Sequence, residues 1–232
     1  MPSQVLKYAL KLANKRVLIL GGTLRESYPE LTAKQSVTTH VCDLSDTSNL
    51  ERNLDSLLKA ATTSGKLNHI VFTAGDALKL PGLSDLNVDI IQQAGVVRFV
   101  APLLLAKLLP KYMDLTVQNS FTMTSGSNTV KPSPGWALMS GWGGAVEGVM
   151  RGLAVDLKPL RVNIVSPGAV YTEILSGIAK DNLEGVLQHF RDTSTTGTVG
   201  RPEDLAESYI YVMKDQFITG SIVESNGGRL LV

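Results

Sequence analysis

Short apolar runs alternate along this chain with longer segments in which apolar residues recur every three or four positions. Continuous short runs are typical of strands buried in a parallel sheet, and the longer periodicity is typical of helices that cover it. The predicted strands occupy 16–20, 37–42, 69–73, 121–124, 161–166 and 221–223. The pattern predicts one α/β domain over residues 1–232, a doubly wound parallel sheet with helices on both faces.

The helices between these strands are predicted from apolar faces and from residues that start or stop a helix. Asp46 or Ser48 is placed to cap the first helix, because its side-chain oxygen can accept from the first free N–H groups. Pro110 and Pro159 are placed to end the second and third helices. The predicted helices lie at 50–61, 88–109, 135–157 and 202–214.

The interval between the first two predicted strands is too short for this pattern. Gly21, Gly22 and Thr23 follow the first strand, and only residues 24–35, with Pro29 among them, separate this turn from Ser36. A parallel crossover needs a dozen or more residues with an intact helix, and a proline inside that helix is costly. The sequence therefore predicts that a region around the first helix and second strand is deleted.

Composition excludes several classes of function. The 22 basic and 21 acidic residues are spread evenly and give a net charge of +1, so neither a nucleic-acid stripe nor a polybasic membrane anchor is predicted. Cys42 is the only cysteine, which excludes an internal disulfide. Residues 1–14 lack the apolar core of a secretory signal, and no apolar run reaches membrane-spanning length, so we expect a cytoplasmic protein. His40, His69 and His189 are isolated, so no metal site is predicted.

Three segments carry a resemblance to a known family. They are AVEGVMRGLAVDLKPLRVNIVSPGAVYTE at 145–173, GRPEDLAESYIYVMKDQFITGSIVESNGG at 200–228 and FTAG at 72–75. The chain resembles the short-chain dehydrogenase/reductase superfamily over essentially its whole length. The resemblance implies a Rossmann-type fold, a small-molecule substrate and a nicotinamide cofactor, expected to be NADP although NAD is not excluded.

The resemblance also assigns cofactor-binding roles, at the carboxyl ends of the predicted strands. The Pro-Gly turn at Gly168 closes the site, the phosphate turn begins at Gly21, and Arg98 stands near the family's helix asparagine. The implied cofactor-binding residues are Gly21, Gly22, Thr23, Asp43, Ala74, Gly75, Arg98, Gly168, Val170 and Thr172. The phosphate turn departs from the family pattern, because about 35 residues of a typical member are absent from this chain. Either the polypeptide lacks them or the sequence omits them, for example through a missed exon.

The family's catalytic tyrosine and lysine are replaced. Counting back from Glu147 places Met139 at the tyrosine position and Gly143 at the lysine position. A thioether donates no proton and glycine carries no charge, so the general acid and its tuning cation are both absent. Ser125 matches the family's serine, and it also fits a simple turn at the end of a strand.

The chain resembles an atypical fungal branch of secondary metabolism in which some members lack the tyrosine–lysine pair. In that branch an arginine on the long helix and a tryptophan before the active-site helix contact cofactor and substrate. Arg98 and Trp136 match these positions, so we predict Ser125, Arg98 and Trp136 as catalytic residues. Trp136 and Trp142 are both predicted to frame the substrate entrance. The alternatives are a solvated surface arginine at Arg98 and core or interface packing for the tryptophans. An aspartate that can precede this tryptophan is Ser133 here, which weakens assignment as a cyclase.

Three functions remain open at this stage. We favour a reductase of an iminium-like or polycyclic intermediate, because an iminium cation needs hydride and no proton. The alternatives are a non-redox cyclase of Diels–Alder type that acts by orientation, and an inactive binding protein. Tyr171 is a weak candidate for a replacement acid. The resemblance also implies a homodimer or homotetramer that pairs through helices 88–109 and 135–157.

Overall fold

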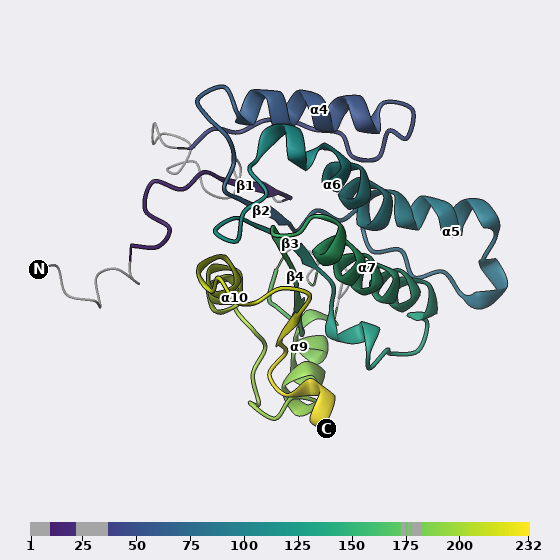
Figure 1. Cartoon of the computed structure of the whole chain (residues 1–232). Coiled ribbons are helices and arrows are strands. Elements are labelled where there is room, and N and C mark those ends of the chain that lie inside the picture. Colours follow the sequence, from purple (N-terminus) through teal and green to yellow (C-terminus); the bar gives the residue numbers. More distant parts are fainter. Residues whose placement is uncertain (1–9, 22–36, 173–174, 176, 178–181) are drawn as a thin grey trace, which may run out of the picture.

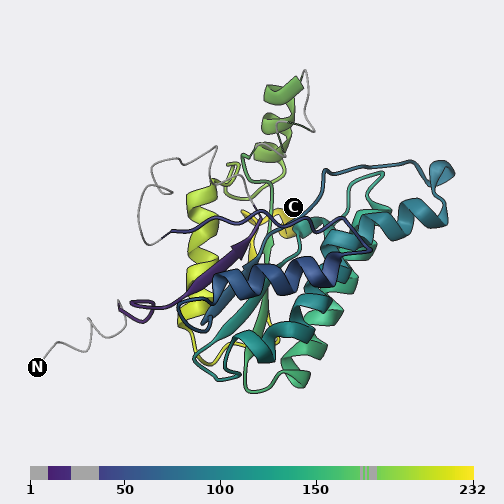
Figure 2. The same cartoon turned by 90° about the horizontal axis from the view of Figure 1, so that it is seen from above.

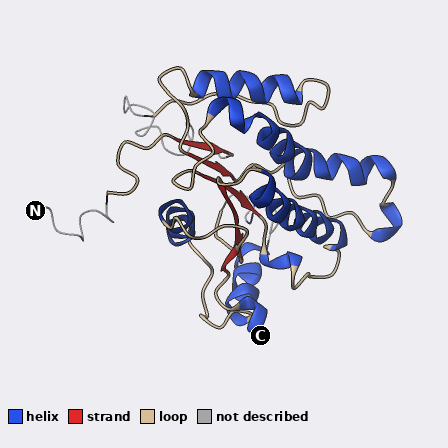
Figure 3. Cartoon of the chain, viewed as in Figure 1, coloured by secondary structure: helices blue, strands red, loops and turns tan. Residues whose placement is uncertain are grey.

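The molecule is built on a parallel five-stranded sheet (Figures 1 and 3). It is a computed structural model that describes residues 10–21, 37–172, 175, 177 and 182–232. Each strand pairs in parallel with the next one along the chain. The strands are β1 (Val17–Leu20), β2 (His69–Phe72), β3 (Ser120–Thr124), β4 (Arg161–Pro167) and β5 (Ile222–Ser225).

Helices cover both faces of this sheet, which confirms the Rossmann-like α/β prediction. Figures 1 and 2 show α4, α6 and α7 on one face and α10 on the other. A π-helical segment (Val96–Val100) joins α5 to α6. The helices are α4 (Leu50–Ala61), α5 (Val88–Gly95), α6 (Ala101–Tyr112), α7 (Ala137–Asp156), α9 (Leu183–Asp192) and α10 (Pro202–Lys214). Within the described ranges the strand order does not reverse, because neighbours in sequence are neighbours in the sheet.

The main core lies between the sheet and the α4, α6 and α7 layer. Ile70, Phe121 and Ile164 point from successive strands into this layer and are completely buried. Leu54 and Leu58 meet them from α4, on the face that the apolar spacing predicts. Each fully buried leucine or isoleucine contributes about 1.5–3 kcal/mol relative to an exposed one, so this layer dominates the stability of the fold.

The predicted strand at 37–42 is wrong, since residues 37–43 are not in a strand. A strand is stable only when a neighbour accepts its backbone hydrogen bonds, and no strand in the described residues pairs with this segment. Asn49, rather than Asp46 or Ser48, occupies the N-cap position of the first helix, and its side chain makes no capping hydrogen bond. Asp46 instead holds the preceding turn, accepting from the backbone N–H of Asn49 at 3.3 Å.

Two other helix predictions need correction. The helix predicted to stop before Pro110 continues to Tyr112, with the proline in its last turn. A proline there removes a single hydrogen bond, and burial of Leu109 and Tyr112 offsets the loss. The helix α9 was not predicted, because it is short and only Leu187 is buried on it.

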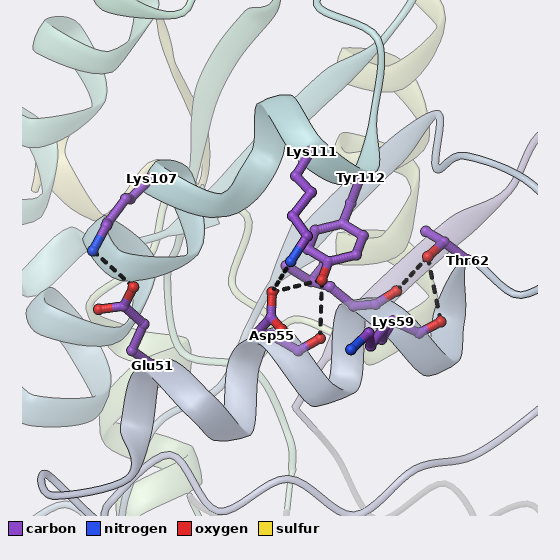
Figure 4. A network of polar contacts seen from close by, with 8 residues as sticks. Glu51, Asp55, Lys59, Thr62, Lys107, Lys111 and Tyr112 are labelled. Atoms are coloured by element: carbon purple, nitrogen blue, oxygen red, sulfur yellow. Dashed lines mark hydrogen bonds and ion pairs between the residues drawn. The ribbon is translucent and has the colours of Figure 1, made fainter.

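Polar contacts hold α4 against α6 on the outer side of the core, as Figure 4 shows. Lys107 Nζ lies 2.7 Å from Glu51 Oε1, and Lys111 Nζ lies 2.8 Å from Asp55 Oδ1. The Tyr112 hydroxyl donates to the same Asp55 oxygen at 2.5 Å. These hydrogen bonds from Lys111 and Tyr112 lower the pKa of Asp55. Because these ion pairs are exposed to solvent, they orient α4 more than they stabilise it.

The face of β1 opposite the main core is open. Val17 and Ile19 point to this face and are 40% and 58% exposed. On this side α10 packs against β3, β4 and β5, while Val17 and Ile19 of β1 stay exposed. Apolar side chains that alternate outward on an uncovered strand indicate that a covering helix belongs here. This agrees with a deletion after Gly21.

The segment Val88–Tyr112 could cross a membrane by length and composition, with a hydropathy of 1.5. In this fold α6 packs against α4, and α5 packs against α7. Within Val88–Tyr112, one third of the most apolar 18-residue stretch is buried inside the molecule. Helices in the interior of globular proteins pass the same composition test, and contacts with α4 and α7 bury part of this segment.

His69 makes the stability of the fold depend on pH. Its ring is 1% exposed, and Nδ1 lies 2.9 Å from Ser120 Oγ. Burial, with a smaller contribution from Arg161 and Lys15, lowers the pKa of His69 to about 4. The folded state thus holds a neutral ring, while the unfolded chain binds a proton below its ordinary pKa near 6.5. Stability from this residue is complete above pH 6.5 and is lost as pH falls toward 4.

We therefore expect the free energy of unfolding to fall by up to about 3 kcal/mol between pH 6.5 and 4 because of His69 alone. Urea titrations across this range measure the slope. His69→Asn, which does not titrate, is expected to remove this part of the slope and leave the part due to carboxylates. Equal slopes in the two proteins would contradict the prediction.

Candidate active site

The carboxyl ends of four neighbouring strands meet at one edge of the sheet. Gly21 follows β1, Gly75 comes shortly after β2, Ser125 follows β3 and Gly168 follows β4. Because these strands are parallel and adjacent, the sheet brings these predicted site residues to one edge. Gly22 and Thr23 lie outside the described residues.

Gly21 packs closely against the end of β2. Its φ angle is 120°, and an added Cβ would lie 2.6 Å from Thr73 Oγ1 and 2.8 Å from the backbone N of Ala74. Only glycine allows both the conformation and the approach. Gly168 also has a packing reason, since a Cβ there would lie 2.8 Å from Asn226 Cα at the end of β5.

Arg98 lies over Gly75 and is fixed by Asp76. Its Nε lies 3.1 Å from Asp76 Oδ1, and its Nη2 donates to the Asp76 carbonyl at 2.6 Å. An added Cβ at Gly75 would lie 2.8 Å from Nη1, so glycine makes room for the guanidinium. Arg98 belongs to the π-helical segment, a local irregularity that is frequent at functional sites. The Arg98 guanidinium is thus fixed in place and partly exposed beside the predicted cofactor turn. Asp76, which fixes it, was not predicted from the sequence.

The positions of the missing acid pair lie on α7. Gly143, at the lysine position, faces Thr129, and any Cβ added there would overlap Thr129 Oγ1. The side chain of Thr129 thus occupies the direction in which a lysine would leave the helix. Met139 lies one turn earlier on the same face and is half-buried. A donor is therefore absent from both positions, and a neighbour fills one of them.

Ser125 donates its hydroxyl hydrogen bond to Glu147. The Ser125 Oγ to Glu147 Oε1 distance is 3.2 Å, and Glu147 is only 9% exposed. Burial raises the pKa of Glu147, while the Ser125 hydrogen bond opposes the shift. Glu147 was missed as a site residue, although it stands four residues after Gly143 and therefore on the same helix face. In this arrangement the serine hydroxyl is directed to a carboxylate rather than to open space.

The two tryptophans have different surroundings. Trp142 packs inside the chain, because its Nε1 donates to the Ile91 carbonyl at 3.0 Å and its ring lies 5.1 Å from Phe99. An added Cβ at Gly95 would overlap this indole. Trp136 is the N-cap residue of α7 and is half-buried. Trp142 is therefore a packing residue, and Trp136 stands where the loop enters the active-site helix.

The remaining predicted residues follow β4 or precede α4. Asp43 is exposed, and hydrogen bonds from the hydroxyl and N–H of Ser45 lower its pKa. Val170 pairs with Gly200 in an isolated bridge, and its carbonyl accepts from the Thr172 hydroxyl at 3.5 Å. Their cofactor contacts stay predictions. Tyr171 is 51% exposed on the same turn.

A family model described as an SDR-like Rossmann domain matches residues 13–232. The chain belongs to the short-chain dehydrogenase/reductase (SDR) family. It is 53% identical to the short-chain dehydrogenase/reductase malC of Malbranchea aurantiaca, over 89% of this chain and 78% of that protein. It is 36% identical to the short-chain dehydrogenase/reductase fsr5 of Gibberella fujikuroi, over 97% of this chain and 98% of that protein. The resemblance to an atypical fungal SDR branch is confirmed.

Solved structures agree with this SDR fold. The structure of the MalC reductase/Diels-Alderase from Malbranchea aurantiaca superposes with a TM-score of 0.86 at 49% identity, over 93% of this chain and 86% of that one. A small-chain dehydrogenase in complex with NADPH gives 0.79 at 26% identity, over 94% of this chain and all of the other. The alignment with fsr5 extends over 264 positions, more than the 232 residues of this chain. Some residues of fsr5 therefore have no counterpart in this sequence.

Proposed function

We propose that this SDR is an NADPH-dependent reductase that reduces an iminium-like or polycyclic intermediate of fungal secondary metabolism. The observation that carries the proposal is the loss of the proton donor and of its cation together. Met139 and Gly143 stand at their positions, and Thr129 fills the space beside Gly143. A site built in this way supports reactions that need no general acid.

The charge balance favours an iminium over a ketone. Adding hydride to a ketone forms an alkoxide that must gain a proton, whereas adding hydride to an iminium carbon gives a neutral amine directly. Ser125 also supports this view, since its hydroxyl hydrogen bond goes to Glu147. Because iminium reduction forms no oxyanion, its rate should fall little when the Ser125 hydroxyl is already bonded to Glu147.

The residues present fit a nicotinamide cofactor in part. When bound, NADPH would supply the hydride. Gly21 and Gly75 lie at the carboxyl ends of β1 and β2, and Arg98, held by Asp76, lies beside Gly75. Arg98 would then pair with a phosphate or ribose oxygen. The shortened phosphate turn weakens the remaining grip.

NADPH titration followed by tryptophan emission tests the proposal, on protein whose intact mass has first been measured. We expect saturable quenching with NADPH, and weaker or no quenching with NADH. Trp136→Phe is the matched control, because Trp142 alone emits in that variant. No saturable change up to roughly millimolar NADPH, far above common cofactor affinities, would contradict the reductase.

A non-redox cyclase is the second candidate. MalC, to which this chain is similar, is described as both a reductase and a Diels-Alderase. A short phosphate turn does not affect catalysis by orientation, which needs only a shaped pocket. Cyclisation of a trapped intermediate without NADPH would favour this candidate.

We further propose a cytoplasmic homo-oligomer, as the family resemblance implies. It pairs through the helix predicted at 88–109, which α5, the π-helical segment and α6 form, and through α7. Several apolar side chains on these helical segments are exposed, among them Val100 at 38% and Val155 at 66%. Their burial in a partner would be favourable. The oligomeric state stays a prediction.

A further inference from the structure

A small polar cavity of about 180 Å³ lies beyond the end of β4, apart from the β1–β2 edge. Its walls come from the turn after β4, the end of α9, the start of α10 and the turn after β5. Five residues with hydroxyl side chains line it: Thr193, Ser194, Thr196, Thr198 and Ser225. This volume holds a few waters or one small anion.

Arg229 points into this cavity and is 7% exposed. Its partners are neutral: Nη1 donates to Thr193 Oγ1 at 3.3 Å, and Nη2 reaches Ser133 Oγ at 3.3 Å and Asn128 Oδ1 at 3.5 Å. Its guanidinium carbon lies 5.6 Å from the centre of the Phe190 ring. None of the ion pairs within the described residues includes Arg229.

A buried guanidinium with only weak, neutral acceptors is an unusual arrangement. Removing a charge from water is costly unless an opposite charge replaces the lost hydration. Arginine cannot escape this cost by losing its proton. The N–H donors of the guanidinium therefore favour an anion in the cavity, because the described neighbours supply no negative charge to them.

The other charges on the wall do not neutralise Arg229. Asp204 is occupied by Arg201, whose Nε and Nη2 lie 2.9 Å and 3.0 Å from its two carboxylate oxygens. The described lining thus carries one uncompensated positive charge. The first turn of α10 also contributes Arg201, Asp204 and Leu205 to the wall, so the positive end of that helix dipole adds to the potential.

We propose that this cavity is a binding site for a small oxyanion, a carboxylate or a phosphate group held by Arg229. Bidentate pairing would satisfy two donors of the guanidinium and replace its weak contacts with Ser133 and Asn128. The cavity adjoins the active site. Ala169 and Val170 line it directly after the Pro-Gly turn, and Ser133 belongs to the loop that ends at Trp136. An anion here would order the segment that presents Trp136.

Thermal unfolding with inorganic phosphate or acetate at constant ionic strength tests the site in the full chain. We expect a saturable increase in Tm of roughly 2–6 °C with at least one anion. A response to phosphate alone indicates a phosphate ligand, and a response to both indicates a carboxylate. This readout needs no NADPH, so it is independent of the proposed reductase activity.

Ser133→Asp is the decisive variant, because it brings a carboxylate to the Arg229 guanidinium. It should raise the Tm by roughly 2–4 °C without added anion and abolish the response to anions. Ser133→Asn, similar in size but neutral, should retain the response. Arg229→Gln should lose it if that variant folds.

Two results would overturn the proposal. One is the absence of a saturable Tm increase in the unaltered protein with either anion. The other is an unchanged anion response in Ser133→Asp, which would place the anions elsewhere on the surface.

Discussion

A Trp136→Ala variant is expected to lose roughly ten- to a hundred-fold in turnover of a cyclic iminium substrate with NADPH. The half-buried indole stands at the start of α7, where a planar cation would pack against its face. A cation–π contact of this kind is worth about 0.5–2 kcal/mol, and lost positioning adds to it. Steady-state kinetics under saturating cofactor measures the change.

Ser125→Ala is the variant to compare with Trp136→Ala. Its hydroxyl bonds to Glu147 and no oxyanion develops in iminium reduction, so turnover should fall less than about threefold. Trp142→Phe serves as the structural control. It removes the hydrogen bond to the Ile91 carbonyl and should lower Tm without changing turnover of the folded enzyme. Activity abolished by Ser125→Ala but retained by Trp136→Ala would point back to carbonyl chemistry.

Restoring the family's acid pair, Met139→Tyr with Gly143→Lys, is expected to raise ketone reduction by less than about tenfold, although general acids are commonly worth 10²–10⁴-fold. A lysine at Gly143 meets Thr129 Oγ1, so the new ammonium cannot take the intended path from the helix. The short phosphate turn predicted from the sequence would limit cofactor binding as well. The assay is NADPH oxidation with a series of simple ketones.

Adding Thr129→Gly to this double variant separates the two causes. If the obstruction dominates, the triple variant should gain activity over the double variant. If cofactor binding dominates, both should remain near background. A double variant that already reduces ketones at rates typical of the family would contradict both explanations.

Local sequence signals predicted most of this fold. Elements whose signal lies in adjacent residues were predicted with little error. Examples are the strand at 69–73 and the helix Pro202–Lys214. The segment 37–42 has equally suitable residues but no partner strand, and pairing is not visible in a local pattern. Helix α9 was missed because so little of it is buried.

The site was predictable only where spacing determines it. Counting along one helix placed Met139 and Gly143 correctly on α7, and the same counting could have found Glu147. The Arg98–Asp76 pair joins residues 22 positions apart, and Arg229 meets Asn128 across 101 positions. Such contacts depend on how the sheet and its loops pack, which no short motif encodes.

The uninterrupted strand order has a consequence for how this chain folds. Each described strand after β1 pairs with the strand that precedes it in the chain, so its partner has already been synthesised. Doubly wound sheets normally begin in the middle, and their first strand pairs with one made much later. Shorter average sequence separation between contacts favours faster folding. We therefore expect this sheet to grow outward from β1 during translation, with α10 and β5 completing it last.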